Sequence, residues 1–167
     1  ETLARFIHHN SLRSQGRFVE VNVSAMTREN PEEELFGFEK GEKLRFGSLE
    51  LANGGTLFLK DVADMDLGTQ ARLLKALENQ EFTRPGGQKN VQIDVRIITS
   101  SRHDLKPLID EGRFREDLFY HLNVLPLKVP SLKERSEDIE ELLDYFLKYF
   151  ASSESFPLRE YSSEIRQ

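Results

Sequence analysis

The sequence contains no cysteine and no tryptophan, and only two methionines among its 167 residues. Without cysteine, neither a disulfide framework nor a thiolate zinc site can form, and such a composition suits the reducing cytoplasm. The sequence also lacks any apolar run near the ~20 residues that cross a bilayer, and it lacks the basic and apolar segments of a signal peptide. We therefore expect a cytoplasmic protein that makes no membrane contact.

An excess of positive charge is also missing. The chain has 23 basic and 29 acidic side chains, which give a net charge of −6 at pH 7. Non-specific binding to nucleic acid requires clustered lysine and arginine. We therefore expect any DNA recognition to belong to another domain of the protein. The length of 167 residues suits one domain with a core of its own.

The histidines do not have the spacing of a metal site. They are His8, His9, His103 and His121, and none belongs to an H-E-x-x-H motif. The sequence also has no G-x-S-x-G segment, which would carry the nucleophile of a serine hydrolase. Both a zinc enzyme and a serine hydrolase are therefore disfavoured.

Apolar periodicity alternates along the chain between the spacing of strands and that of helices. This alternation favours one α/β domain whose mostly parallel sheet is covered by helices on both faces. Strands are predicted over 18–23, 56–59 and 95–99. Helices are predicted around Leu3–Ile7, from Pro31 with Asn30 as its cap, over 66–79, over 115–122, and over 139–150 after a capping box formed by Ser131 and Glu134.

The strand predicted over 56–59 is followed by the pair Lys60-Asp61. A buried parallel strand with a carboxylate at its C-terminal end is the geometry that holds Mg²⁺ or polarises water beside a nucleotide. A strand followed by a plain aspartate turn explains the same residues, so this pattern alone does not decide the function.

Six strings of residues occur in one order along nearly the whole chain. They are ELFGFEKG (34–41), LELANGGTLFL (49–59), QARLL (70–74), VRII (95–98), GRFREDL with LNV (112–124) and LKERSEDI (132–139). Together they resemble the AAA+ ATPase domain of bacterial enhancer-binding proteins. These are the sigma-54-dependent transcriptional activators of the nitrogen-regulator type.

The resemblance implies a P-loop NTPase-type α/β sandwich of three layers (AAA+). Residues 1–150 would form the core and residues 151–167 the start of a small helical lid. It also implies a response regulator of a two-component system, whose subunits form a ring-shaped homo-oligomer, hydrolyse ATP to ADP with Mg²⁺, and remodel RNA polymerase carrying sigma-54. The family's phosphate loop would precede residue 1, so that Glu1 follows its lysine directly.

The resemblance also assigns roles to individual residues. Asn22 corresponds to the asparagine that senses the nucleotide by pairing with the second Walker B acid, which is Asp61 here. Arg115 corresponds to an arginine that reaches the ATP of the neighbouring subunit. Asn22, Asp61 and Arg115 are thus the expected catalytic residues, and Asp61 is also the expected Mg²⁺ ligand. The expected nucleotide-binding residues are Glu1, Lys60, Ser101 and Arg102.

The Walker B pair departs from the family pattern. It is Asp-Glu in the family and Lys60-Asp61 here, which places a cation where Mg²⁺ calls for an anion. Since a misplaced general base can slow a reaction by about 10²-fold, we expect slow hydrolysis. An alternative is that Lys60 supplies positive charge directly to the phosphates and permits binding with little metal.

Two further positions differ from the family. Its polymerase-contacting loop, GAFTGA, is expected after Gly41, but the chain continues GEKLRFG over 41–47 and rejoins the family pattern at once. The loop is either deleted in the protein or absent from this sequence of it. His121 stands where the family has a second arginine, so contact with ATP across the ring would depend on Arg115 alone.

Three interpretations stay open at this point. In the first, the chain belongs to a ring-forming ATPase that activates sigma-54 transcription. In the second, it is a degenerate AAA+ module with weak or no ATPase and no sigma-54 contact, which serves nucleotide-sensitive oligomerisation. In the third, it is an interaction scaffold that does not depend on nucleotide. The first two share one fold and one family.

Overall fold

The computed structural model of the chain describes residues 1–26 and 31–153. The chain forms two compact units, Glu1–Val124 and Leu125–Gln167. The expected helix cap Asn30 lies outside the described residues, and so does the expected lid segment beyond Ser153.

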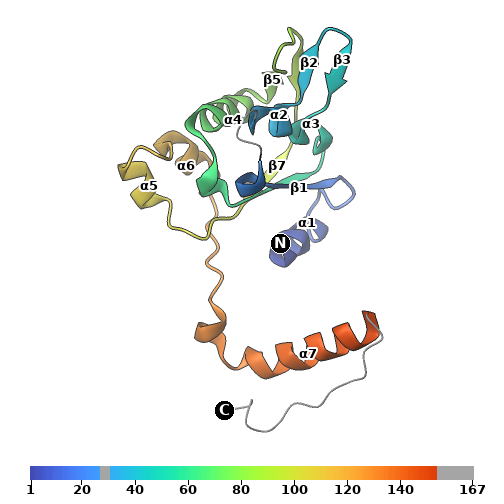
Figure 1. Cartoon of the computed structure of the whole chain (residues 1–167), viewed down its shortest axis with the longest axis vertical. Coiled ribbons are helices and arrows are strands. Elements are labelled where there is room, and N and C mark those ends of the chain that lie inside the picture. The colour runs from blue at the N-terminus through green and yellow to red at the C-terminus, as the bar shows by residue number, and fades with distance from the viewer. Residues whose placement is uncertain (27–30, 154–167) are drawn as a thin grey trace. The chain divides into compact units, whose positions relative to one another are not determined.

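A parallel sheet of three strands forms the centre of the first unit (Figure 1). Its order is β1 (Phe18–Asn22), β4 (Thr56–Lys60) and β7 (Arg96–Thr99), with β4 in the middle. The first four residues of β4 are buried, because a middle strand is hydrogen-bonded on both sides and covered on both faces. The three predicted strands and their parallel arrangement are confirmed.

One face of the sheet packs against a cluster of helices. Leu57 and Leu59 of β4 and Val21 of β1 share a buried core with Leu35 and Leu118, which helices contribute. Figure 1 shows these helices together on one side of β1. The helices that follow β1 in the first unit are α2 (Pro31–Phe36), α3 (Ser48–Leu51), α4 (Leu67–Asn79), α5 (Lys106–Asp110) and α6 (Glu116–Leu122).

The opposite face of the sheet is covered by α1 (Thr2–His9). His8 is only 2% exposed, and its Nδ1 lies 2.9 Å from the hydroxyl of Thr56 in β4. The His8 ring also packs against Phe18 of β1, which in turn lies against Phe58 of β4. Helices on both faces of a parallel sheet confirm the predicted three-layer α/β architecture.

Two short hairpins were not predicted. They pair β2 (Phe38–Lys40) with β3 (Lys43–Arg45) and β5 (Glu81–Thr83) with β6 (Asn90–Gln92). Gly41 has a φ of +60° in the turn that joins β2 to β3, a conformation that glycine adopts without strain. The chain thus turns back within two residues where the resemblance expects the polymerase-contacting loop.

The second unit contains a 3₁₀ turn and a long helix. The predicted capping box is present, but Ser131 and Glu134 open the 3₁₀ turn Leu132–Arg135 (η3) rather than the long helix. The long helix, α7, runs from Asp138 to Ser153 and confirms the helix predicted over 139–150. Two more 3₁₀ turns in the first unit are η1 (Val23–Ala25) and η2 (Val62–Asp64). Within 1–26 and 31–153, no helix has the length and apolar character needed to cross a membrane.

Candidate functional site

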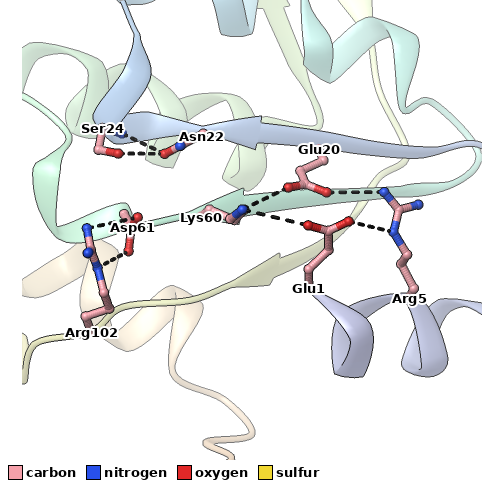
Figure 2. A network of polar contacts seen from close by, with 8 residues as sticks. All are labelled: Glu1, Arg5, Glu20, Asn22, Ser24, Lys60, Asp61 and Arg102. Atoms are coloured by element: carbon pink, nitrogen blue, oxygen red, sulfur yellow. Dashed lines mark hydrogen bonds and ion pairs between the residues drawn. The ribbon is translucent and has the colours of Figure 1, made fainter. Parts of the chain in front are cut away.

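The C-terminal ends of the parallel strands gather most of the predicted site residues. Asn22 ends β1 and is paired in register with Lys60, which ends β4, and Asp61 follows directly. Ser101 and Arg102 come just after β7. Parallel strands place their carboxyl ends at one edge of a sheet, where ligands of α/β proteins bind. Figure 2 draws and labels Asn22, Lys60, Asp61 and Arg102 at this edge.

Lys60 is held by two carboxylates. Its Nζ lies 3.2 Å from Oε1 of Glu20 and 3.8 Å from Oε2 of Glu1. Glu20 and Lys60 lie on the same face of the sheet, because side chains alternate along paired strands whose register is fixed. In Figure 2 the Lys60 side chain points along the sheet toward these acids and away from Asp61.

Arg5 of α1 completes this group on the other side. It contacts Oε2 of Glu20 at 3.3 Å and Oε1 of Glu1 at 3.1 Å, and its guanidinium lies 4.7 Å from the centre of the Phe18 ring. The hydrogen bond from Arg5 lowers the pKa of Glu1 below its ordinary value. Both carboxylates are therefore shared between Lys60 and Arg5, which ties α1 to β1 and β4.

Asp61 makes a separate ion pair. Its oxygens accept from Nε and Nη2 of Arg102 at 3.0 and 3.3 Å. The Asp61 side chain is 17% exposed, whereas that of Arg102 is 73% exposed. Asp61 has a φ of +55°, a left-handed conformation that aspartate tolerates better than most residues. The turn after β4 thus presents its carboxylate to the segment after β7.

Asn22 and Ser101 are engaged in local turns. The side-chain oxygen of Asn22 accepts from the backbone nitrogen and the hydroxyl of Ser24, at 3.2 and 2.7 Å. Ser101 bonds in the same local way to the backbone of His103. The predicted pairing of Asn22 with Asp61 is not made in this structure, because asparagine at the end of a strand caps the turn that follows.

Arg115 lies apart from this group. It precedes α6, and its guanidinium contacts Asp117 at 3.0 and 2.6 Å, which lowers the pKa of Asp117. Within the part of the chain that the structure describes, Arg115 contacts none of the residues drawn in Figure 2. The sequence resemblance predicts that Arg115 reaches the ATP of a neighbouring subunit. The structure of a single chain does not test this prediction.

Three residues have structural roles that were not predicted from the sequence. Glu20 pairs with both Lys60 and Arg5, and Gln70 bonds to the backbone in front of α6 through Arg113 and Arg115. Glu20 had a visible signal, since it interrupts the apolar run of β1. Gln70 begins the string QARLL that marks the family, but nothing in the sequence indicated that it is buried, because a polar side chain in a helix is ordinarily exposed.

Comparison with known proteins identifies the family. The model of the sigma-54 interaction domain matches residues 1–128. The chain belongs to this family. The sequence resemblance to the AAA+ domain of enhancer-binding regulators is thereby confirmed.

Curated members of this sigma-54 interaction family share much of the sequence. Regulatory protein AtoC of Escherichia coli (strain K12) is 46% identical over 157 residues, which cover 91% of this chain and 34% of AtoC. The nitrogen assimilation regulatory protein NtrX of Azorhizobium caulinodans is 50% identical over 149 residues, with 88% of this chain and 33% of NtrX covered. The chain thus spans about a third of the length of these relatives.

Solved structures agree on the fold. NtrX from Brucella abortus, crystallised in complex with ATP, matches with a TM-score of 0.93 and 44% identity, over 99% of this chain and 38% of that one. The same protein in complex with ADP matches equally well, with a TM-score of 0.93 over 98% of this chain. The architecture of the first unit is therefore that of the P-loop NTPases of this family.

Proposed function

We propose that this sigma-54 interaction domain binds ATP and ADP as the nucleotide-responsive part of a bacterial transcriptional regulator. The observation that carries the proposal is the match, over nearly the whole chain, to NtrX crystallised with each of these nucleotides. The convergence of Asn22, Lys60, Asp61 and Arg102 at one edge of the sheet supports it, because ligands of α/β proteins bind beyond the carboxyl ends of strands.

The proposed regulator is a response regulator of a two-component system, as the sequence resemblance implies, and it acts in the cytoplasm. DNA recognition belongs to a part of the protein outside this chain, since the chain itself carries a net charge of −6. The nucleotide lies between subunits of a homo-oligomeric ring. Arg115 supports this arrangement, because its side chain is 42% exposed and, among the residues that the structure describes, contacts none of the other site residues.

Mg²⁺ would accompany the nucleotide at Asp61 if the family's chemistry is kept. The residues present fit this ion poorly, because Arg102 already occupies both oxygens of Asp61 and the position before Asp61 is Lys60, which is not an oxygen ligand. Asp61 is also one methylene shorter than the glutamate of the family. We therefore expect ATP turnover about 10²-fold slower than with an Asp-Glu pair, because the general base is misplaced.

A second candidate function is a module with little ATPase and no sigma-54 contact. The direct turn from Lys40 to Lys43 favours it, because this segment leaves no room for a polymerase-contacting loop. Such a module would use nucleotide binding to control oligomerisation within the transcription factor. DNA binding and the response to phosphorylation would not depend on hydrolysis.

One experiment tests the first proposal and separates it from the second. Binding of a fluorescent ADP analogue and the rate of ATP hydrolysis are measured on the full-length protein, beside the double variant Lys60→Asp with Asp61→Glu. We expect binding by both proteins, and hydrolysis about 10²-fold faster in the variant. Failure of both proteins to bind would refute the proposed function.

Transcription from a sigma-54 promoter in vitro then decides between the two candidates. Activation by the wild-type protein would establish the first, and no activation by either protein would establish the second. Lys43→Asp, which makes the same change of charge on the exposed strand β3, serves as the matched control and is expected to behave as the wild type.

A further inference from the structure

Asp61 and Arg102 form a two-point ion pair at the carboxyl edge of the sheet (Figure 2). Oδ1 of Asp61 accepts from Nε of Arg102 at 3.0 Å, and Oδ2 accepts from Nη2 at 3.3 Å. Contact at both oxygens fixes the orientation of the guanidinium against the carboxylate and strengthens the pair. In the described ranges 1–26 and 31–153, neither side chain has another ion-pair partner. Both oxygens of Asp61 are therefore engaged by this one side chain.

The backbone fixes the place of Asp61 independently of Arg102. The Val62 nitrogen donates to the carbonyl oxygen of Ser100 at 3.0 Å, and the Ser100 nitrogen donates to that of Leu59 at 2.9 Å. These two bonds join the turn after β4 to the segment after β7, and they lie on either side of Asp61 in the sequence. We therefore expect the Asp61 carboxylate to stay at the edge of the sheet when Arg102 moves away from it.

The Arg102 side chain is the movable half of the pair. It is 73% exposed, so water can replace its contact with Asp61 at little cost in free energy. The turn around it is fixed through the backbone of His103, which bonds to the Ser101 hydroxyl, and this leaves the Arg102 side chain free to turn. The pair thus has a closed form, which the structure shows, and an accessible open form in which Asp61 has lost its partner.

The two forms differ in what Asp61 can do chemically. Hydrolysis of ATP forms a bond from a water oxygen to the γ-phosphorus and breaks the bond from that phosphorus to the departing ADP oxygen. A general base takes the proton from the water, and the sequence resemblance assigns this role to Asp61. In the closed form the oxygens of Asp61 already accept from a guanidinium, and arrival of a proton would break the ion pair. Asp61 can therefore serve as a base only in the open form.

We propose that Arg102 is a latch on Asp61, which withholds the carboxylate from ATP hydrolysis as long as both of its oxygens are paired. The inference rests on the proposed function and deepens it, because it names a residue that regulates the same site. Arg102 acts through Asp61 and is in this sense a positioning residue. This role differs from the nucleotide contact that the resemblance implies for Arg102.

The test compares the rate of ATP hydrolysis at saturating ATP between the full-length wild type and Arg102→Gln. An exposed ion pair shifts an equilibrium by up to about 5-fold, so we expect kcat to rise by about that factor when the latch is removed. The affinity for a fluorescent ADP analogue is measured on the same samples. It is expected not to rise, because the latch acts on the base rather than on the phosphates.

A double-mutant cycle shows whether the effect passes through Asp61. With Asp61→Asn in place, the further change Arg102→Gln is expected to leave kcat as it is, since the base is already absent. Arg102→Lys keeps the charge but loses the planar two-point contact, and its kcat is expected to lie between those of the wild type and Arg102→Gln.

Two further variants keep the test decisive. Arg113→Gln is the matched control, because it removes another exposed guanidinium, which pairs with Glu111 at 3.1 Å, and it is expected to hydrolyse ATP as the wild type does. Arg102→Ala answers the question if Arg102→Gln does not fold, which circular dichroism detects. It is expected to give the same rise in kcat.

The outcomes separate this inference from the proposed function. If the proteins bind the ADP analogue but removal of the Arg102 guanidinium leaves kcat unchanged or lowers it, the latch is refuted, whereas nucleotide binding stands. An equal rise in kcat in the Asp61→Asn background would also refute the latch, because the effect would not depend on Asp61. If no protein binds the analogue, the proposed function fails and the inference fails with it.

Discussion

Replacing Gln70 by leucine removes a buried polar side chain that links two parts of the first unit. Gln70 is fully buried in α4, and its Nε2 donates to the carbonyl oxygens of Met65, at 2.6 Å, and Arg113, at 3.1 Å. Its Oε1 accepts from the backbone nitrogen of Arg115 at 2.8 Å. Leucine has nearly the same volume, so the substitution tests these three hydrogen bonds rather than the packing.

The expected loss of stability follows from the number of bonds. A hydrogen bond contributes about 1 kcal/mol to the free energy of unfolding, and a buried group left without a partner costs at least as much, so Gln70→Leu should cost about 3 kcal/mol. That is a large fraction of the ~5–15 kcal/mol that stabilises a typical domain. At about 3 °C per kcal/mol for a unit of this size, the melting temperature should fall by about 10 °C.

Urea unfolding of the full-length protein, followed by circular dichroism, measures this loss. Amide hydrogen exchange adds a local readout, since the Arg115 amide should exchange faster once Gln70 no longer accepts from it. Lys75→Ala, at an exposed position of the same helix, is the matched control and should lie within about 0.5 kcal/mol of the wild type. A Gln70→Leu protein within about 1 kcal/mol of the wild type would refute the role given to these bonds.

Two other predictions concern the packing of the sheet. Burial, with the nearby charge of His9, lowers the pKa of His8 below its ordinary value, so the unfolded chain takes up a proton that the folded chain does not. The free energy of unfolding should therefore fall as the pH drops below about 6.5, and His8→Gln should flatten that fall in urea titrations between pH 8 and pH 5. Gly55→Ala should cost about 3 kcal/mol, because the new Cβ would lie 2.1 Å from the carbonyl oxygen of Arg17 and force the start of β4 away from β1.

Each of these predictions has its own control. An unchanged pH dependence in His8→Gln would show that other groups, and not His8, govern stability in this range. Gly54→Ala is the control for Gly55→Ala. A Cβ at position 54 would meet nothing within 4 Å, and only the positive φ of 74° opposes the substitution there. The cost at Gly54 should be about 1 kcal/mol, and a cost equal to that at Gly55 would contradict the steric argument.

The helices and strands that the sequence predicted are those with long local patterns. The helix over 66–79 could be predicted because its apolar spacing covers more than three turns and Asp66 caps it, as the structure shows. The hairpins β2–β3 and β5–β6 could not, since strands of three residues are too short for an alternation to show. The capping box of Ser131 was visible in sequence, but not that it opens a 3₁₀ turn.

For the candidate site, too, the sequence predicted some features and could not predict others. Its residues could be named from the sequence: Lys60-Asp61 directly follows a string that marks the family, and the resemblance assigned Asn22 and Arg102 by their correspondence to family positions. Their partners could not be named. Asp61 and Arg102 are separated by 41 positions, and only the parallel pairing of β4 with β7 brings the segments that carry them together.

By itself the sequence determined the family, the strands of the sheet, and the replacement of an acid by Lys60. These are properties of residue identity and of local spacing, which the chain carries before it folds. Only the tertiary structure determined which groups the Lys60 ammonium contacts. The register of β1 against β4, and the packing of α1 on the same face, set Glu20 and Glu1 beside the Lys60 ammonium group. Contacts between distant segments depend on how the chain closes on itself rather than on any local pattern.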